Sequence, residues 1–229
     1  MRLTALTLLP LLCVMQSACS EAGTESAPQS TAPSSSTEST QASTFGSPLA
    51  QGNANVTLVK LETTKGDIVI EVHSEWAPNG AQRFLELVNN GFYDGVKFFR
   101  VIEGFMAQTG MNGDPEMHQK WMDNNIQDDP VTQSNKRGYV TFAQTAAPNS
   151  RSTQFFINYT DRNAFLDSQR FAPFGVVVEG MDVVDSLYNG YGESPNQGMI
   201  IQKGNEYLEA KFPKLDTIKK ASVVESTDA

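Results

Sequence analysis

Short apolar runs closed by turn residues are the feature that most restricts how this chain can fold. Residues Val56–Glu62 and Asp67–His73 alternate apolar and polar side chains on either side of Thr64-Lys65-Gly66, which predicts a β-hairpin. Its inward face should carry Ile68, Ile70 and Val72. Further runs bounded by Gly, Pro, Asn or Asp lie at Lys97–Ile102, Phe105–Gln108, Gly138–Ala143, Thr153–Asn158, Phe171–Glu179 and Thr217–Glu225. So many short strands predict one mainly β domain over residues 53–226, a closed antiparallel barrel, with a tail at 227–229.

Two helices are expected to cap this barrel. The first spans about Ala77–Asn90, with Pro78 in its first turn and Gly91 at its C-terminal cap. Its apolar stripe consists of Phe84, Leu85 and Val88. The second is predicted at Met181–Tyr188, and Gly204–Phe212 indicates an extra short helix before the final strand.

The N-terminal residues indicate a targeting signal rather than part of the folded domain. One positive charge precedes an apolar run too short to span a bilayer, so residues 1–18 are interpreted as a signal peptide. The small residues before Cys19 resemble a bacterial lipoprotein cleavage site, which would make Cys19 a lipidated first residue. Residues 19–52 are rich in Ser, Thr and Pro and are expected to form a disordered tether. These features predict a lipid-anchored protein facing the periplasm. By analogy with bacterial lipoproteins, Ser20 after the cysteine favours the outer membrane. The alternative is a soluble periplasmic or secreted protein.

Composition excludes several classes of function. The formal net charge is −9 and no run of Lys and Arg occurs, so nucleic acid is not an expected partner. The two cysteines, Cys13 and Cys19, both precede the predicted domain, which therefore has no disulfide or thiolate nucleophile. With only His73 and His118, a His-rich zinc site is excluded, and no calcium-loop pattern is present. No metal or cofactor is expected.

The segment Phe98–Gly110 carries an unusual set of side chains. It places Arg100, the pair Phe105-Met106 and Gln108 on neighbouring strand segments, with Gly104 allowing a sharp change of direction. Judged by periodicity alone, Arg100 would be a surface ion-pair partner and Phe105-Met106 would be core.

A family resemblance changes that interpretation. The segment Phe98–Gly110 resembles the cyclophilin pattern F-H-R-[IV]-I-x-G-F-M-x-Q-G-G, and Phe142–Asn158 is similar to the run M-A-[NR]-x-x-x-x-x-S-x-S-Q-F-F-I of the same family. Asn163–Asp167 and Phe174-Gly175 continue the series in the expected order. The resemblance extends over most of the predicted domain. It implies an eight-stranded barrel with an active groove on its outer face.

The resemblance also implies a role for individual residues. Arg100 matches the catalytic arginine of the family, and Gln108 matches the side chain that binds a substrate carbonyl. Ala143 and Gln144 fall where the groove contacts the residue before proline, and Gln154 lines the same groove. The pocket for the proline ring is matched by Phe105, Met106, Phe156 and Leu166.

Two substrate-binding positions depart from the family pattern. Phe171 stands where many cyclophilins have a pocket histidine, which leaves an apolar wall without a hydrogen-bond donor. Phe165 stands where eukaryotic members have a tryptophan that binds cyclosporin, so weak cyclosporin binding is expected. Residues Met111–Lys136 form a long polar segment that either packs against the barrel or contacts substrate.

The resemblance implies a peptidyl-prolyl cis-trans isomerase acting on exported or envelope proteins. Arg100 would stabilise the twisted X-Pro amide, and proline-containing polypeptides would be the partners of a monomeric domain. The rival hypothesis is a non-catalytic proline-binding chaperone or scaffold with the same fold. A purely structural envelope lipoprotein is a third possibility, and it predicts no binding of proline peptides.

Overall fold

The computed structural model describes residues 56–224, and the structural statements below concern these residues. The predicted signal peptide, the lipidated Cys19, the tether and the C-terminal tail lie outside them. Within the described part, no helix combines the length and the apolar character needed to cross a membrane.

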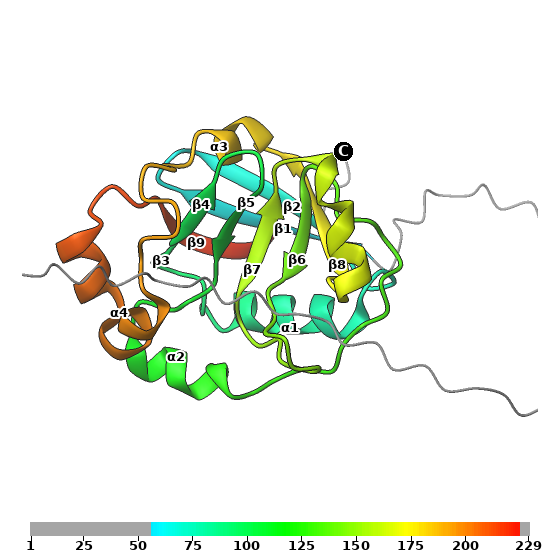
Figure 1. Cartoon of the computed structure of the whole chain (residues 1–229), viewed down its shortest axis with the longest axis horizontal. Coiled ribbons are helices and arrows are strands. Elements are labelled where there is room, and N and C mark those ends of the chain that lie inside the picture. Colours follow the sequence, from blue (N-terminus) through cyan, green and yellow to red (C-terminus); the bar gives the residue numbers. More distant parts are fainter. Residues whose placement is uncertain (1–55, 225–229) are drawn as a thin grey trace, which may run out of the picture. The chain divides into compact units, whose positions relative to one another are not determined.

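A single curled antiparallel sheet forms the framework of residues 56–224 (Figure 1). Its nine strands are β1 (Val56–Thr63), β2 (Asp67–His73), β3 (Val96–Lys97), β4 (Arg100–Ile102), β5 (Met106–Thr109), β6 (Tyr139–Phe142), β7 (Phe155–Asn158), β8 (Pro173–Glu179) and β9 (Thr217–Val224). The hydrogen-bonded order is β3-β9-β1-β2-β8-β6-β7-β5-β4. The mainly β class and the antiparallel arrangement are therefore as predicted.

The number of strands differs from the eight that were expected. The run Lys97–Ile102, predicted as one strand, is divided by Phe98 and Phe99 into β3 and β4, which pair with different partners. The printed order begins at β3 and ends at β4, so closure of the barrel stays a prediction.

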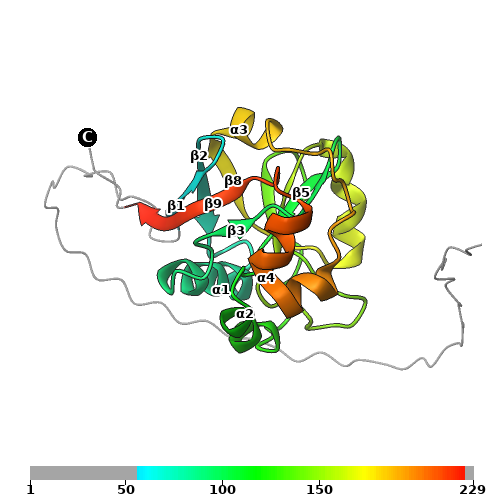
Figure 2. The ribbon, with the colours of Figure 1, turned by 90° about the vertical axis from the view of Figure 1, so that its left-hand side faces the viewer.

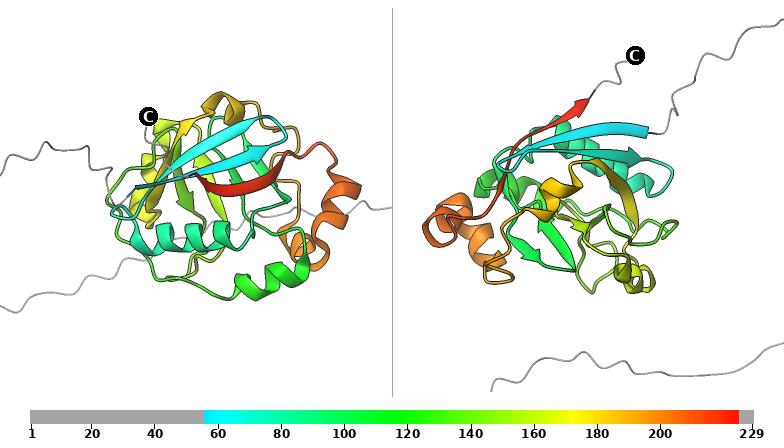
Figure 3. Two further views of the ribbon diagram at one scale, coloured as in Figure 1. Left: turned by 180° about the vertical axis from the view of Figure 1, so that it is seen from behind. Right: turned by 90° about the horizontal axis from the view of Figure 1, so that it is seen from above.

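The hairpin of β1 and β2 shows why the alternating pattern predicted these strands well. Ile68, Ile70 and Val72 are fully buried, and in the ladder Leu61 lies opposite Ile68 and Val59 opposite Ile70. Alternate residues on a strand share one face, so the apolar positions all enter the core while their neighbours face outward. Seen from behind, the hairpin lies beside β9 with α1 (Pro78–Asn89) running across below (Figure 3).

Helix α1 closes the main core as predicted. Phe84, on its buried face, packs against the rings of Tyr93, Phe155 and Phe174 at centroid distances of 4.9–5.4 Å. Pro78 lies in the first turn, where the missing N–H costs nothing. The N-terminal amides of Asn79 and Gly80 are instead satisfied by the carboxylate of Asp129.

The expectation of two capping helices is wrong, because residues 56–224 contain further helices. They are α2 (Pro115–Met122), the 3₁₀ helix η1 (Asp161–Gln169), α3 (Met181–Asp185) and α4 (Gln197–Lys211). Helix α2 lies inside the segment predicted as a long loop, and Asp114 caps it by accepting from the amide of Glu116. Helix α3 ends three residues before the predicted Tyr188, since the amide of Ser186 already closes the last turn.

Helix α4 begins earlier than the predicted Gly204–Phe212. It starts after Asn196, whose side chain accepts from the amide of Met199, and it bends at Gly204, where φ is 53° and ψ is −134°. A Cβ at Gly204 would lie 1.9 Å from the carbonyl oxygen of Gly113, so glycine permits this close approach. The amide of Asn205 then donates to the same oxygen at 2.9 Å.

A second apolar cluster holds α4 against the sheet. Its buried members are Phe99, Met111, Ile200, Leu208 and Leu215. Figure 2 shows α4 beside α2 at one end of the sheet. Figure 1 shows the chain between α3 and α4 passing beside β4, the last strand in the order of the sheet.

Candidate active site

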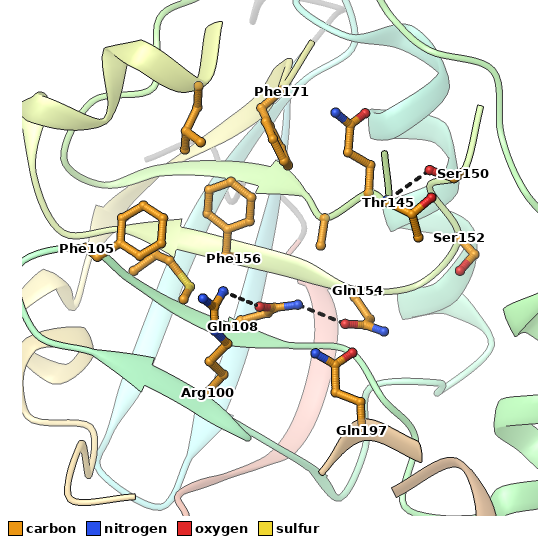
Figure 4. Close-up of a pocket in the computed structure, with 14 residues that line it drawn as sticks. Arg100, Phe105, Gln108, Thr145, Ser150, Ser152, Gln154, Phe156, Phe171 and Gln197 are labelled. Carbon is orange, nitrogen blue, oxygen red and sulfur yellow. Dashed lines mark hydrogen bonds between the residues drawn. The ribbon is translucent and has the colours of Figure 1, made fainter. Parts of the chain in front are cut away.

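A row of polar side chains crosses the outer face of β4, β5 and the start of β7. Arg100 on β4 lies directly opposite Gln108 on β5, and residues opposite one another in an antiparallel pair share a face. Nη1 of Arg100 donates to Oε1 of Gln108 at 3.2 Å. Nε2 of Gln108 in turn donates to Oε1 of Gln154 at 2.9 Å (Figure 4). These bonds orient both side-chain amides.

An apolar cluster lies next to this row. Met106 on β5, Phe156 on β7 and Leu166 on η1 are its buried members. Partly buried side chains packed against them are Ile102, Phe105, Ala143 and Phe171. The rings of Phe156 and Phe171 meet edge to face at 5.7 Å between centroids. The cluster therefore forms an apolar surface next to the positively charged guanidinium of Arg100.

The polar row and the apolar cluster line one open cavity of about 380 Å³. Its lining includes the side chains predicted for the groove: Arg100, Phe105, Met106, Gln108, Ala143, Gln144, Gln154, Phe156, Leu166 and Phe171. Segments far apart in the sequence thus converge on one cavity, and the roles assigned to these side chains stay predictions. Such a mixture of apolar surface and few polar groups is typical of a small-ligand or peptide site.

Phe165 is the predicted groove residue that is absent from this lining. Its side chain is 53% exposed and stacks on Phe105 at 6.3 Å between ring centroids. Phe165 thus extends the rim outward from Phe105, next to the cavity.

Several lining residues were not singled out from the sequence. They are Thr145, Ser150, Ser152 and Gln197. The two serines belong to the second sequence signature, so their position within that motif was an available signal. Gln197 is the first residue of α4, and no local pattern indicated that this helix would reach the groove.

Arg100 carries the only formal charge among the residues that line the cavity. Its guanidinium carbon lies 5.9 Å from the ring centre of Phe105. It also forms an ion pair with Glu193, a residue outside the lining that the sequence analysis did not identify. A cation beside an apolar pocket can hold a small ring and donate a hydrogen bond to an adjacent atom.

The η1 helix that supplies Leu166 is held by a carboxylate. Burial would raise the pKa of Asp167, but hydrogen bonds from Ser134 and Asn135 stabilise the ionised form and hold the pKa below its usual range. Asn135 is fully buried and also donates to the carbonyl oxygen of Phe171 at 2.8 Å. One polar network therefore positions both Leu166 and Phe171.

The described residues of the lining include no side chain that commonly activates a hydroxyl nucleophile or binds a metal ion. Ser150 and Ser152 are its hydroxyl side chains besides Thr145, and no His, Lys, Asp or Glu accompanies them there. Across residues 56–224, no group of three or more His, Cys, Asp and Glu side chains is arranged to hold a metal ion.

Comparison with known proteins gives a consistent result. The family model described as "Cyclophilin type peptidyl-prolyl cis-trans isomerase/CLD" matches residues 58–206. A peptidyl-prolyl cis-trans isomerase of Acinetobacter baylyi is 40% identical over 138 residues, covering 58% of this chain and 72% of the relative. Peptidyl-prolyl cis-trans isomerase B of Escherichia coli is 38% identical over 137 residues, covering 57% and 83%.

Solved structures show the same fold. The cyclophilin AquaCyp293 of Hirschia baltica superposes with a TM-score of 0.56 at 24% identity, covering 75% of each chain. A cyclophilin type peptidyl-prolyl cis-trans isomerase of Cryptosporidium parvum, in the presence of the dipeptide Ala-Pro, gives a TM-score of 0.55 at 22% identity, covering 74% of this chain and 99% of that one.

Proposed function

Because the chain belongs to the cyclophilin-type peptidyl-prolyl cis-trans isomerases, it is an enzyme that accelerates rotation about X-Pro bonds, and we propose that Arg100 is its catalytic residue. The observation that supports this role is the guanidinium of Arg100 beside the apolar cavity, held there by Gln108.

The chemistry requires a donor at the prolyl nitrogen. Rotation about the peptide bond breaks its resonance and has a barrier of about 18–20 kcal/mol. When the amide twists, the nitrogen becomes pyramidal and basic, so it accepts a hydrogen bond that the planar amide accepts poorly. A donor fixed at that position binds the transition state more tightly than the substrate, which lowers the barrier.

The remaining side chains fit the parts of a proline peptide. Met106, Phe156, Leu166 and Phe171 provide apolar surface for the pyrrolidine ring. Gln108 would bind a substrate carbonyl, Gln154 lines the groove beside it, and Ala143 and Gln144 would contact the residue before proline. The Ala-Pro dipeptide with the Cryptosporidium relative supports proline-containing polypeptides as the ligand class.

Substitution of Arg100 tests this mechanism. In a protease-coupled proline-peptide assay, we expect Arg100→Ala to lower kcat/KM by about 10²–10³-fold, the usual effect of losing one transition-state donor. Arg100→Lys should retain only part of the activity, since an ammonium does not reproduce the planar fork. The matched control is Arg137→Ala, which removes an arginine paired with Asp185 outside this cavity. Full activity in Arg100→Ala would leave the domain as a proline-binding chaperone or scaffold module.

We also propose that the isomerase works at the bacterial envelope, anchored through Cys19. The support is the apolar N-terminal run, the small residues before Cys19 and the Ser/Thr/Pro-rich stretch after it. In bacterial cells given a labelled fatty acid, the full-length chain should incorporate label and fractionate with membranes, whereas Cys19→Ala should not. Unlabelled wild-type protein in the soluble periplasmic or secreted fraction would reject the anchor.

A further inference from the structure

A carboxylate from outside the cavity contacts the proposed catalytic arginine. Oε1 of Glu193 accepts a hydrogen bond from Nε of Arg100 at 2.7 Å and a second from Nη2. The carboxylate side chain is 63% exposed and that of Arg100 is 29% exposed. The Glu193 carboxylate therefore binds the Nε–Nη2 edge of the guanidinium from the solvent side. In the sequence, Glu193 and Arg100 are 93 residues apart.

The chain around Glu193 is a structured turn. The amide of Gly192 donates to the carbonyl of Asn189 at 3.0 Å, and the amide of Ser194 donates to the carbonyl of Tyr191 at 2.9 Å. The ring of Tyr191 packs between Tyr188 and Phe212, at 4.9 and 5.1 Å between centroids. The backbone that presents Glu193 is thus held on both sides.

The same turn is tied to the strand that carries Arg100. Phe99 precedes Arg100 and is buried in the apolar cluster with Ile200 and Leu208 of α4. Successive residues of an extended chain point to opposite faces. Phe99 accordingly packs against α4 on one face, while Arg100 lines the cavity on the other. Packing therefore holds the backbone segments that carry Glu193 and Arg100 relative to one another.

The hydrogen-bond count of Arg100 shows that this contact does not block it. A guanidinium has five N–H donors. Glu193 takes one from Nε and one from Nη2, and Gln108 takes one from Nη1. One donor on each terminal nitrogen is left for a substrate.

We propose that Glu193 is a positioning residue that fixes the plane of the Arg100 guanidinium for catalysis. This inference rests on the proposed role of Arg100. Gln108 accepts from Nη1 of Arg100, and Glu193 accepts from Nε and Nη2. The guanidinium group therefore cannot rotate without losing a charge-assisted hydrogen bond. The free donors then point in one direction before substrate arrives, which reduces the ordering needed in the transition state.

The expected effect is small but has a specific signature. An exposed ion pair contributes about 0.2–1 kcal/mol, which corresponds to at most about a fivefold change in rate. We expect Glu193→Ala to lower kcat about two- to fivefold with KM unchanged, and Glu193→Gln, which keeps an acceptor, to lower it less. At about 1 M salt, where screening acts over about 3 Å, the wild type should lose part of this advantage and Glu193→Gln should not.

Controls separate positioning from a general structural effect. Glu209→Gln is the matched variant, because Glu209 is also exposed, belongs to α4 and pairs with a basic side chain, Lys97, at 3.7 Å. It should leave kcat unchanged. In the Arg100→Lys background, whose ammonium cannot make the paired contact, Glu193→Ala should change kcat less than about twofold, since the two effects are coupled.

The outcomes are distinguishable from failure of the proposed function. If Arg100→Ala loses activity while Glu193→Ala matches or exceeds the wild type, the positioning role is wrong and the catalytic role of Arg100 stands. An equal loss from Glu193→Ala in the wild-type and Arg100→Lys backgrounds would also overturn positioning. If Arg100→Ala keeps full activity, both proposals fall together.

Discussion

At the scale of single residues, two phenylalanines close to each other in sequence have different surroundings. Phe171 lines the cavity and packs edge to face on Phe156, and its carbonyl oxygen is held by the buried Asn135. Phe165 is half exposed, does not line the cavity, and stacks on Phe105 at its rim. Substituting each of them in turn would distinguish binding of the proline ring in the cavity from contacts at its rim.

Phe171→Ala should therefore weaken substrate binding. Removing this wall takes away roughly 1–2 kcal/mol of apolar contact with a bound ring, so we expect KM to rise about tenfold with kcat changed less than about threefold. Steady-state kinetics with a proline tetrapeptide would measure both constants. Phe165→Ala, the control, should change KM less than about twofold. A rise in KM for Phe165→Ala as large as that for Phe171→Ala would mean that the substrate binds chiefly at the rim.

At the scale of elements, a strand or helix was predicted well where a local sequence pattern defined it. The β1–β2 hairpin follows from strict alternation, since Ile68, Ile70 and Val72 all enter the core. Helix α1 follows from an apolar stripe and a proline in the first turn. Part of the lining of the cavity was identified through the family's sequence signatures and not through periodicity, which would have left Arg100 as a surface residue.

Other elements were missed because tertiary contacts define them. Helix α4 has a glycine with positive φ in its interior, so its two halves do not share one apolar stripe. Gly204 allows the chain to pass close to Gly113, and nothing in the local sequence indicates that contact. The pairing of Glu193 with Arg100 depends in turn on where α4 docks. Helix α2 did carry a recognisable start, Asp114-Pro115, but its short polar sequence resembles a loop.

At the scale of the whole molecule, His118 links α2 to the rest of the domain. Its side chain is 2% exposed, and its Nδ1 accepts a hydrogen bond from the amide of Asn112 at 3.3 Å. The side-chain amide of Asn112 donates to the carbonyl oxygen of Phe92, on the main core. Burial lowers the pKa of His118, because the charged imidazolium is poorly solvated there. A proton on Nδ1 would also abolish its role as acceptor.

The stability of the domain should consequently fall as the pH drops below about 6.5, the ordinary pKa of histidine in an unfolded chain. In that range the unfolded state takes up a proton that the folded state does not, so the free energy of unfolding decreases until the pH reaches the lowered pKa of His118. For one proton the slope is at most about 1.4 kcal/mol per pH unit. Urea unfolding at a series of pH values from 7.5 to about 5 would measure it.

His118→Asn should flatten this dependence, since asparagine offers an acceptor but does not titrate. Carboxylates contribute to the acid side of the curve in both proteins, so the difference between them isolates the histidine. The matched control is Gln119→Asn, an exposed and non-titrating position of the same helix that keeps His118. That control should retain the wild-type slope. If His118→Asn instead loses stability by the same amount at every pH, His118 acts through packing alone and the protonation argument is wrong.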